Sequence, residues 1–219
     1  MALGRPLRVA RIPVLGLLVA SLVLAACGSP NYHYLSSRSD SNWVRVPADW
    51  KLYDEDVLLT LSDDSTEQKA ETKRLTWSWA FDADPKPSLK HVLGVVALNH
   101  PWGIVQARTL KPDQRDTMSL AGLRSIFLGF DPLSDEALKS GEVEVVQGHQ
   151  IIGPGKLHGM ELLLNLKTDA GWVKWRQVAL ADGILDKVHV LAISCSDKCY
   201  FENKAQIDKI VASWKVKER

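Results

Sequence analysis

Alternating apolar runs in the second half of the chain constrain the fold most strongly. The segment HGMELLLNLK, residues 158–167, places apolar and polar side chains on opposite sides with a period of two, which is typical of a half-buried strand. The runs at 171–180 and 187–194 have the composition of further strands. The sharp turn at Asp169-Ala170-Gly171 indicates that neighbouring strands are antiparallel.

Other segments add strands and helices to this pattern. Strands are expected at 43–46, 50–61, 73–81, 91–99 and 141–148, and the continuous apolar run at 91–99 predicts a central strand. A middle helix is predicted from an N-cap at Asp116 up to Gly129, and a short one from Ser134 to Gly141. The last helix is the clearest, with Ile207, Ile210, Val211 and Trp214 at i, i+3, i+4 and i+7. The order of elements predicts an α+β domain, with helices packed on a mainly antiparallel sheet.

The first 26 residues have the features of an export signal. Three arginines and no acid precede an apolar run, Ile12–Leu24, that is too short to span a bilayer, where about 20 residues are needed. Leu24-Ala25-Ala26-Cys27 then resembles the bacterial lipobox, in which the thiol of the cysteine accepts a diacylglyceryl group and the signal is cut before it. The alternative is an ordinary signal peptide with a chance cysteine. We predict lipidation at Cys27, with fatty acyl chains such as palmitate holding the protein on a membrane.

The cleaved chain would then consist of a flexible tether and one domain. Residues 27–41 are polar and serine-rich, and they predict a lipid-anchored tether; residues 42–219 suit a single α+β domain. Loss of the three signal arginines turns the net charge of +1 slightly negative. This charge excludes a nucleic-acid-binding footprint, and the absence of a polybasic cluster gives no sign of headgroup binding.

Two cysteines remain once Cys27 is assigned to lipid. Cys195 and Cys199 lie four residues apart in ISCSDKCYF, and an oxidising compartment favours a structural disulfide between them. A zinc site would need two more ligands of matching spacing, and none lies nearby. A thioredoxin-type pair would be one residue shorter.

No pattern in the sequence predicts catalysis, a metal or a cofactor. The six histidines form no H-x-x-x-H or H-x-H pair, and the G-x-S-x-G sequence of serine hydrolases is absent. The acidic residues at 54–56 and 63–64 lack the EF-hand pattern. We therefore expect a protein that is not an enzyme and that uses neither metal nor cofactor.

Eight tryptophans are the unusual feature of the composition. Trp77, Trp79 and Trp214 fall on predicted inward faces and are expected in the core. Trp102, in NHPWG, and Trp172, in AGWVKW, lie beside turn residues, so these two are the candidates for an exposed binding surface.

In its order of elements the chain resembles the PsbP-like sandwich, and within it the bacterial DcrB-like lipoproteins. The resemblance spans roughly Trp43 to Lys217 and is carried by VRVPADW, SLAGLRSIFLGF, LHGMELLLNLKTDAGWVKWRQVAL, VHVLAISCS and KAQIDKIVASWKV. It implies an α/β/α sandwich with a non-catalytic role in binding or assembly, and it carries no active-site residues across. The Cys195/Cys199 pair departs from that family.

These features lead to one leading hypothesis and two alternatives. The leading hypothesis is a bacterial envelope lipoprotein that binds or helps assemble another envelope protein. A second is a carrier or sensor of a small apolar or sugar ligand, held in a pocket lined by Trp77, Trp79 and the middle helix; a third is a hydrolase with an unrecognised site. Because Gly28 is not the aspartate that retains lipoproteins in the inner membrane, we expect the outer membrane in a two-membrane host, and otherwise the outer face of the cell membrane.

Overall fold

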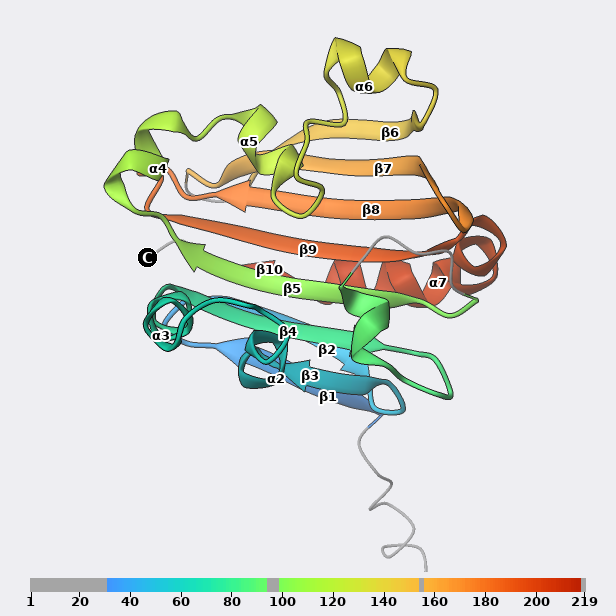
Figure 1. Cartoon of the computed structure of the whole chain (residues 1–219), viewed down its shortest axis with the longest axis horizontal. Coiled ribbons are helices and arrows are strands. Elements are labelled where there is room, and N and C mark those ends of the chain that lie inside the picture. The colour runs from blue at the N-terminus through green and yellow to red at the C-terminus, as the bar shows by residue number, and fades with distance from the viewer. Residues whose placement is uncertain (1–30, 94–98, 154–155, 218–219) are drawn as a thin grey trace, which may run out of the picture. The chain divides into compact units, whose positions relative to one another are not determined.

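A seven-stranded antiparallel sheet forms the centre of the computed structural model, which describes residues 31–93, 99–153 and 156–217 (Figure 1). The alternation predicted for residues 158–167 is confirmed, since Met160, Leu162, Leu164 and Leu166 are buried. In spatial order the strands are β3 (Lys51–Asp54), β4 (Thr76–Asp82), β5 (Trp102–Thr109), β9 (Lys187–Ser196), β8 (Gly171–Ala181), β7 (His158–Thr168) and β6 (Val143–Ile152).

One face of this sheet is covered by a long helix and a second, smaller sheet. The helix α7 (Asp197–Ser213) begins at the end of β9, where the Ser196 hydroxyl accepts a hydrogen bond from the Cys199 amide. The smaller sheet contains β1 (Tyr32–Ser37), β2 (Asn42–Pro47) and β10 (Lys215–Val216). Its apolar residues share one core cluster with α7 and with the facing side of β9.

The prediction for the last helix is confirmed. Ile207 and Ile210 are fully buried, Val211 packs against the same cluster, and Trp214 is buried at the helix end. The indole of Trp214 also donates a hydrogen bond to the side-chain oxygen of Asn42 in β2, at 2.7 Å. A single amphipathic helix therefore joins the two sheets through apolar packing and one buried hydrogen bond.

The opposite face carries short helices. They are η1 (Leu89–Val92), α4 (Pro112–Thr117), α5 (Leu120–Ser125) and α6 (Asp135–Lys139), and Figure 1 shows α5 in front of β7 and β8. The single middle helix predicted from Asp116 is divided, because the backbone is extended at Met118 and Ser119. Ser119, not Asp116, caps α5, whereas Ser134 caps α6 as predicted.

Two predicted strands are wrong in whole or in part. Residues 50–61 form a strand only in β3 and continue as α2 (Glu55–Leu59), which Asp54 caps. Residues 89–92 form the short helix η1, so the central strand predicted at 91–99 does not begin there, and residues 94–98 lie outside the described ranges. A further helix, α3 (Thr66–Leu75), was not predicted, because it buries no residue and shows no apolar periodicity.

The prediction of a flexible tether up to residue 41 is also wrong where the structure describes the chain. Residues 32–37 pair with β2 over the full length of the strand, from Tyr32 opposite Pro47 to Ser37 opposite Asn42. The side chains of Leu35 and Ser37 are buried. The folded domain therefore begins at Tyr32, and residues 1–30, which include the predicted signal and Cys27, lie outside the described ranges.

The fold class is as predicted from the sequence. Helices and a small sheet pack on both faces of one antiparallel sheet in an α+β sandwich. In residues 31–93, 99–153 and 156–217, no helix combines the length and the apolar character that a membrane span requires.

Candidate functional site

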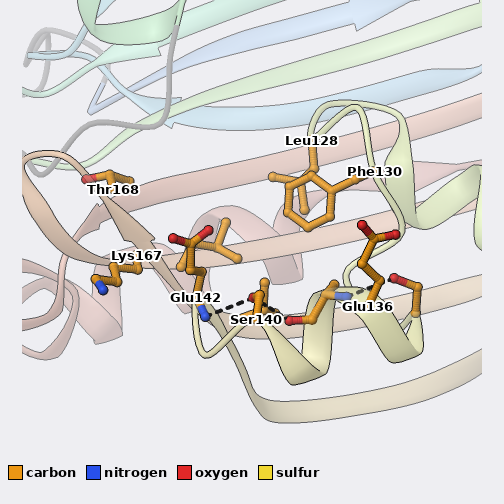
Figure 2. Close-up of a pocket in the computed structure, with 11 residues that line it drawn as sticks. Leu128, Phe130, Glu136, Ser140, Glu142, Lys167 and Thr168 are labelled. Atoms are coloured by element: carbon orange, nitrogen blue, oxygen red, sulfur yellow. Dashed lines mark hydrogen bonds between the residues drawn. The ribbon is translucent and has the colours of Figure 1, made fainter.

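A pocket of about 390 Å³ lies between α6, the loop before it, the edge strand β6 and its neighbour β7 (Figure 2). The buried side chains of Ala137, Val143 and Leu166 contribute apolar surface. Leu128 and the ring of Phe130, which is 43% exposed, add to it from the loop. Pockets of a few hundred Å³ with mainly apolar walls are typical of sites for small ligands.

The rim of the pocket is polar. Glu136 on α6, Glu142 before β6 and Lys167 on β7 bring two carboxylates and one ammonium group to it. The described residues contain no group of three or more histidine, cysteine or acidic side chains that could hold a metal ion. The pocket can therefore accommodate an apolar group and orient a polar one at its mouth.

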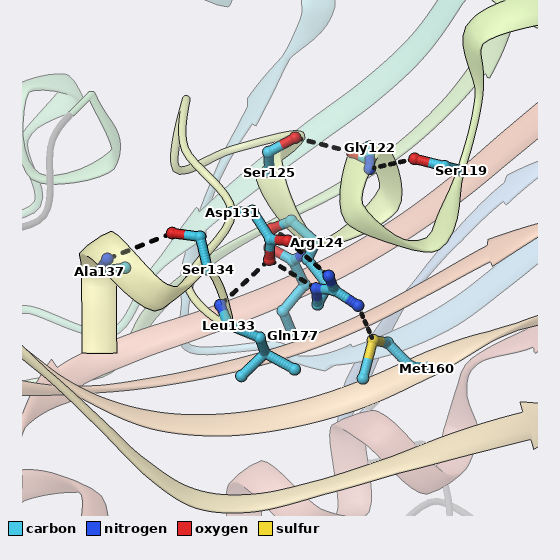
Figure 3. Close-up of polar contacts among 10 residues, drawn as sticks. All are labelled: Ser119, Gly122, Arg124, Ser125, Asp131, Leu133, Ser134, Ala137, Met160 and Gln177. Atoms are coloured by element: carbon cyan, nitrogen blue, oxygen red, sulfur yellow. Dashed lines mark hydrogen bonds and ion pairs between the residues drawn. The ribbon is translucent and has the colours of Figure 1, made fainter. Parts of the chain in front are cut away.

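An ion pair holds the loop that forms one wall of the pocket (Figure 3). Arg124 at the end of α5 binds Asp131 through two parallel contacts, Nε to Oδ1 at 2.6 Å and Nη2 to Oδ2 at 2.5 Å. Asp131 Oδ1 also accepts the backbone N–H of Leu133, at 3.0 Å. These hydrogen bonds from Arg124 hold the pKa of the Asp131 carboxyl below its usual value, although burial acts in the opposite direction. Leu128 and Phe130 lie within the loop closed by this pair.

A buried glutamine ties the same helix to the sheet. Gln177 on β8 donates from Nε2 to the carbonyl oxygens of Leu123, at 3.0 Å, and Arg124, at 3.2 Å. Its Oε1 accepts the indole N–H of Trp175, at 3.2 Å. Because the last carbonyls of a helix have no partner within it, this side chain satisfies groups that would otherwise be buried without hydrogen bonds.

Capping interactions fix the other wall. The Ser134 hydroxyl accepts the Ala137 N–H at the start of α6, and the Ser140 hydroxyl donates to the Ala137 carbonyl and accepts the Glu142 N–H at the end. Gly141 follows with a φ of +73°, a conformation that favours glycine. The chain thus turns from α6 directly into β6, which keeps Ala137 and Val143 on the same wall.

The sequence did not identify Phe130 or Leu128 as site residues. Gly129 between them has a φ of +75°, and the segment continues into Asp131-Pro132. Two apolar residues on either side of a glycine, directly followed by Asp-Pro, could have indicated a loop with an exposed aromatic side chain.

Trp102, predicted as a binding surface, is buried. Only 3% of it is exposed, and its ring lies 5.9 Å from the ring of Trp175 in an edge-on arrangement. Its position beside Pro101 suggested exposure. However, Trp102 is the first residue of β5, which lies between β4 and β9. Val92 of η1 belongs to the same apolar cluster as Trp102. Its indole nitrogen has no hydrogen-bond partner among the described residues.

Trp172, the second predicted surface residue, is 38% exposed. It lies near the start of β8, opposite Lys167 of β7. Lys167 lines the pocket, so Trp172 is at the same end of the sheet, although it is not among the lining residues.

The predicted disulfide is present. Cys195 at the end of β9 and Cys199 in the first turn of α7 are bonded and buried, with Cα atoms 5.9 Å apart. It joins the strand to the helix that covers it. Cys27 lies outside the described residues, and its lipidation stays a prediction.

The pocket imagined for a carrier is not formed by the residues predicted. Trp77 and Trp79 pack against the core cluster that contains α7, whereas the middle helix, now α4 and α5, lies on the other face of the sheet. They cannot line one pocket, because the sheet separates them.

One contact bears on the hydrolase alternative. His91 Nδ1 lies 2.8 Å from a carboxylate oxygen of the buried Asp82. The same carboxylate accepts the backbone N–H groups of Asp84 and Ser88, so it organises the turn between β4 and η1. Within the described ranges, no serine, threonine or cysteine side chain forms a hydrogen bond with His91, and this pair carries no catalytic assignment.

Comparison with solved structures identifies the fold. A scan of protein-family models and a search of curated proteins find no match to the sequence. The structure is similar to cyanobacterial PsbP (CyanoP) from Synechocystis sp. PCC 6803, with a TM-score of 0.50 at 10% identity over 88% of this chain and 96% of that one. The chain has a PsbP-like fold.

A weaker similarity is found to LpqN, involved in cell envelope biogenesis of Mycobacterium tuberculosis. Its TM-score is 0.42 at 11% identity, over 91% of this chain and 97% of that one. At these identities the PsbP-like similarity defines the fold alone. The narrower resemblance to DcrB-like lipoproteins stays a prediction.

Proposed function

We propose that this protein is a bacterial cell-envelope lipoprotein, anchored outside the cytoplasm by lipid on Cys27, whose PsbP-like domain binds or helps assemble another envelope protein without doing chemistry. The observation that carries the proposal is the tetrad Leu24-Ala25-Ala26-Cys27 at the end of a short apolar run that follows a basic N-terminus. A lipobox needs small residues before the cysteine and a thiol to accept the lipid, and both are present.

The anchor is tested by replacing Cys27. In a bacterial host, Cys27→Ala should move the protein from the membrane fraction to the soluble extracytoplasmic fraction, because the acyl chains are lost. The matched control is the double variant Cys195→Ala/Cys199→Ala, which removes the other two cysteines and should stay with the membrane. Unchanged fractionation of Cys27→Ala would contradict the lipobox assignment.

The partner is sought by crosslinking in the native envelope, followed by mass spectrometry. The expected result is a crosslink to one or a few envelope proteins in wild type. This crosslink should be lost in Cys27→Ala, because the lipid anchor keeps the protein at the membrane. Crosslinks that spread over unrelated proteins in proportion to their abundance would count against a dedicated partner.

The pocket beside α6 favours a second candidate, a carrier or sensor of a small apolar ligand. Ala137 lines the pocket, so Ala137→Trp should fill it. We expect this variant to lose binding of an apolar fluorescent probe that wild type binds. Ala205→Trp, on the exposed side of α7, is the matched control and should bind as wild type does. Equal binding by both variants, or none by wild type, would refute the carrier.

A further inference from the structure

The start of the folded domain limits how the protein can sit on a membrane. Only Gly28, Ser29, Pro30 and Asn31 separate Cys27 from Tyr32, the first residue of β1. The five steps from the Cα atom of Cys27 to that of Tyr32 span at most about 18 Å, whereas the tether of 15 residues expected from composition would have reached about 50 Å. If Cys27 carries lipid, as proposed above, the beginning of β1 must therefore lie close to the bilayer.

Strand pairing shows which part of the domain shares this end. Tyr32 is opposite Pro47, and a tight turn with a hydrogen bond from the Trp50 amide to the Pro47 carbonyl leads into β3. The same end of the large sheet is marked by residues that lie opposite each other on neighbouring strands. These pairs are Lys51–Asp82, Asp82–Trp102, Trp102–Ser194 and Ser196–Val173. We call this the anchor end; in Figure 1 it is the right-hand end of the strands.

Two large aromatic side chains are exposed at the anchor end. Trp172 precedes Val173 in β8 and is 38% exposed; Phe201, in the second turn of α7 after Ser196, is 81% exposed. Tryptophan concentrates at membrane interfaces because its ring is apolar but carries a polar N–H, and phenylalanine enters the same region by burying its apolar ring. Lys198 and Asp197 beside Phe201 are also exposed and can remain in water.

The opposite end of the sheet has exposed apolar residues as well, so exposure alone does not choose the membrane-facing end. Ile184, in the turn between β8 and β9, is 74% exposed. An eleven-residue strand such as β8 is about 36 Å long, which is twice the reach of the linker. Because β1 starts at the anchor end, the short linker can hold that end on the membrane but cannot bring the Ile184 end to it.

We propose that the anchor end of the domain rests on the lipid bilayer, with Trp172 and Phe201 in the headgroup region and the Ile184 turn directed away from the membrane. This inference rests on the lipid anchor proposed above. A lipid surface, and not a protein, then covers the two aromatic side chains. Partner proteins then have the far end and the two faces of the sandwich available.

The test uses the lipidated full-length protein in phosphatidylcholine vesicles. Cys27 is blocked by lipid and Cys195 by Cys199, so a new cysteine is the reactive thiol under non-reducing conditions. Phe201→Cys and the matched control Ile184→Cys, both at exposed apolar positions, are labelled with an environment-sensitive fluorophore. Flotation of the vesicles is measured first, and emission with and without a lipid-borne quencher second.

The expected result is a blue shift and quenching for the label at 201, and neither for the label at 184. Protein that floats but shows the same emission at both positions, or a shift at 184 alone, would overturn the orientation while leaving the anchor intact. Protein that fails to float would overturn the anchor itself. Trp172→Cys provides a second label at the anchor end and should behave as Phe201→Cys does.

Discussion

The two faces of the large sheet are covered in different ways. On one, the 17-residue helix α7 buries Ile207 and Ile210 and is joined to β9 by a disulfide. On the other, α5 and α6 have six and five residues and bury one residue each, Leu123 and Ala137. Polar contacts of Gln177 and Arg124 add to the apolar packing there, and that face carries the pocket. Both faces therefore contain apolar core, and the face with the short helices also contains the pocket beside α6.

The largest effect is expected on the α7 face. Trp214→Ala removes a buried aromatic ring and its hydrogen bond to Asn42, and it should lower the free energy of unfolding by about 3–5 kcal/mol. Urea denaturation followed by circular dichroism measures it. Phe201→Ala, on the exposed side of the same helix, is the control and should change stability by about 0.5 kcal/mol or less. A similar loss for both would mean that α7 does not pack as described.

The α7 face was predictable from sequence, and the other face was not. The spacing of Ile207, Ile210 and Trp214 predicts a helix that packs one apolar face against the core. Helices of five or six residues have too few turns to show a period, and their positions depend on capping hydroxyls such as those of Ser119 and Ser134. The pocket beside α6 depends on the loop closed by Arg124 and Asp131, a contact that no spacing rule identifies.

The sequence-based predictions for β1 and Trp102 failed for the same reason. Composition does not show which strands pair or which neighbouring elements cover a side chain. The serine-rich segment that became β1 buries little, but its backbone pairs with β2 along its length. Trp102 stands beside a proline and was expected at the surface, yet both neighbouring strands and η1 surround it. For α3, the capping box formed by Ser65 and Gln68 was a usable signal, although the helix is polar all round.

A second difference between the faces concerns pH. His189 on β9 is buried beside Asn42, and burial lowers its pKa from 6.5 to about 4. The unfolded chain thus binds a proton between these pH values that the folded one does not, so stability should fall by up to about 1.4 kcal/mol for each unit as the pH drops from 6.5 to about 4. The nearby charges of Lys187 and Asp40 act in opposite directions.

Urea midpoints measured at pH 7, 5.5 and 4.5 test this prediction. His189→Gln cannot take up the proton, and its stability should depend less on pH in this range than that of wild type, whatever its absolute value. The exposed His149→Gln is the matched control and should keep the wild-type dependence. Identical slopes for wild type and His189→Gln would refute the assignment.

A smaller and more local effect is expected from Gln177→Leu. The substitution leaves the carbonyls of Leu123 and Arg124 and the Trp175 indole without their buried partner, which should cost about 1–3 kcal/mol. Amide hydrogen exchange should increase in α5 and the following loop, while α7 keeps its protection. Gln147→Leu, at an exposed position of β6, is the control. Equal loss of protection in α5 and α7 would show that the two faces do not open independently.

The smallest effect is expected from Asp131→Asn, which removes the charge partner of Arg124. Because Arg124 lowers the pKa of Asp131 in the folded state, this pair stabilises the protein above the unfolded carboxyl pKa, and the contribution is lost as the pH falls through the folded value. At pH 7 we expect a loss of about 1 kcal/mol together with weaker binding of an apolar probe, since Leu128 and Phe130 lie in the loop that the pair closes. Asp135→Asn, whose partner Lys139 is exposed, should leave both measurements unchanged. If Asp131→Asn binds the probe as wild type does, the ion pair is not what shapes the pocket, and the ligand-binding role proposed for this face loses its structural basis.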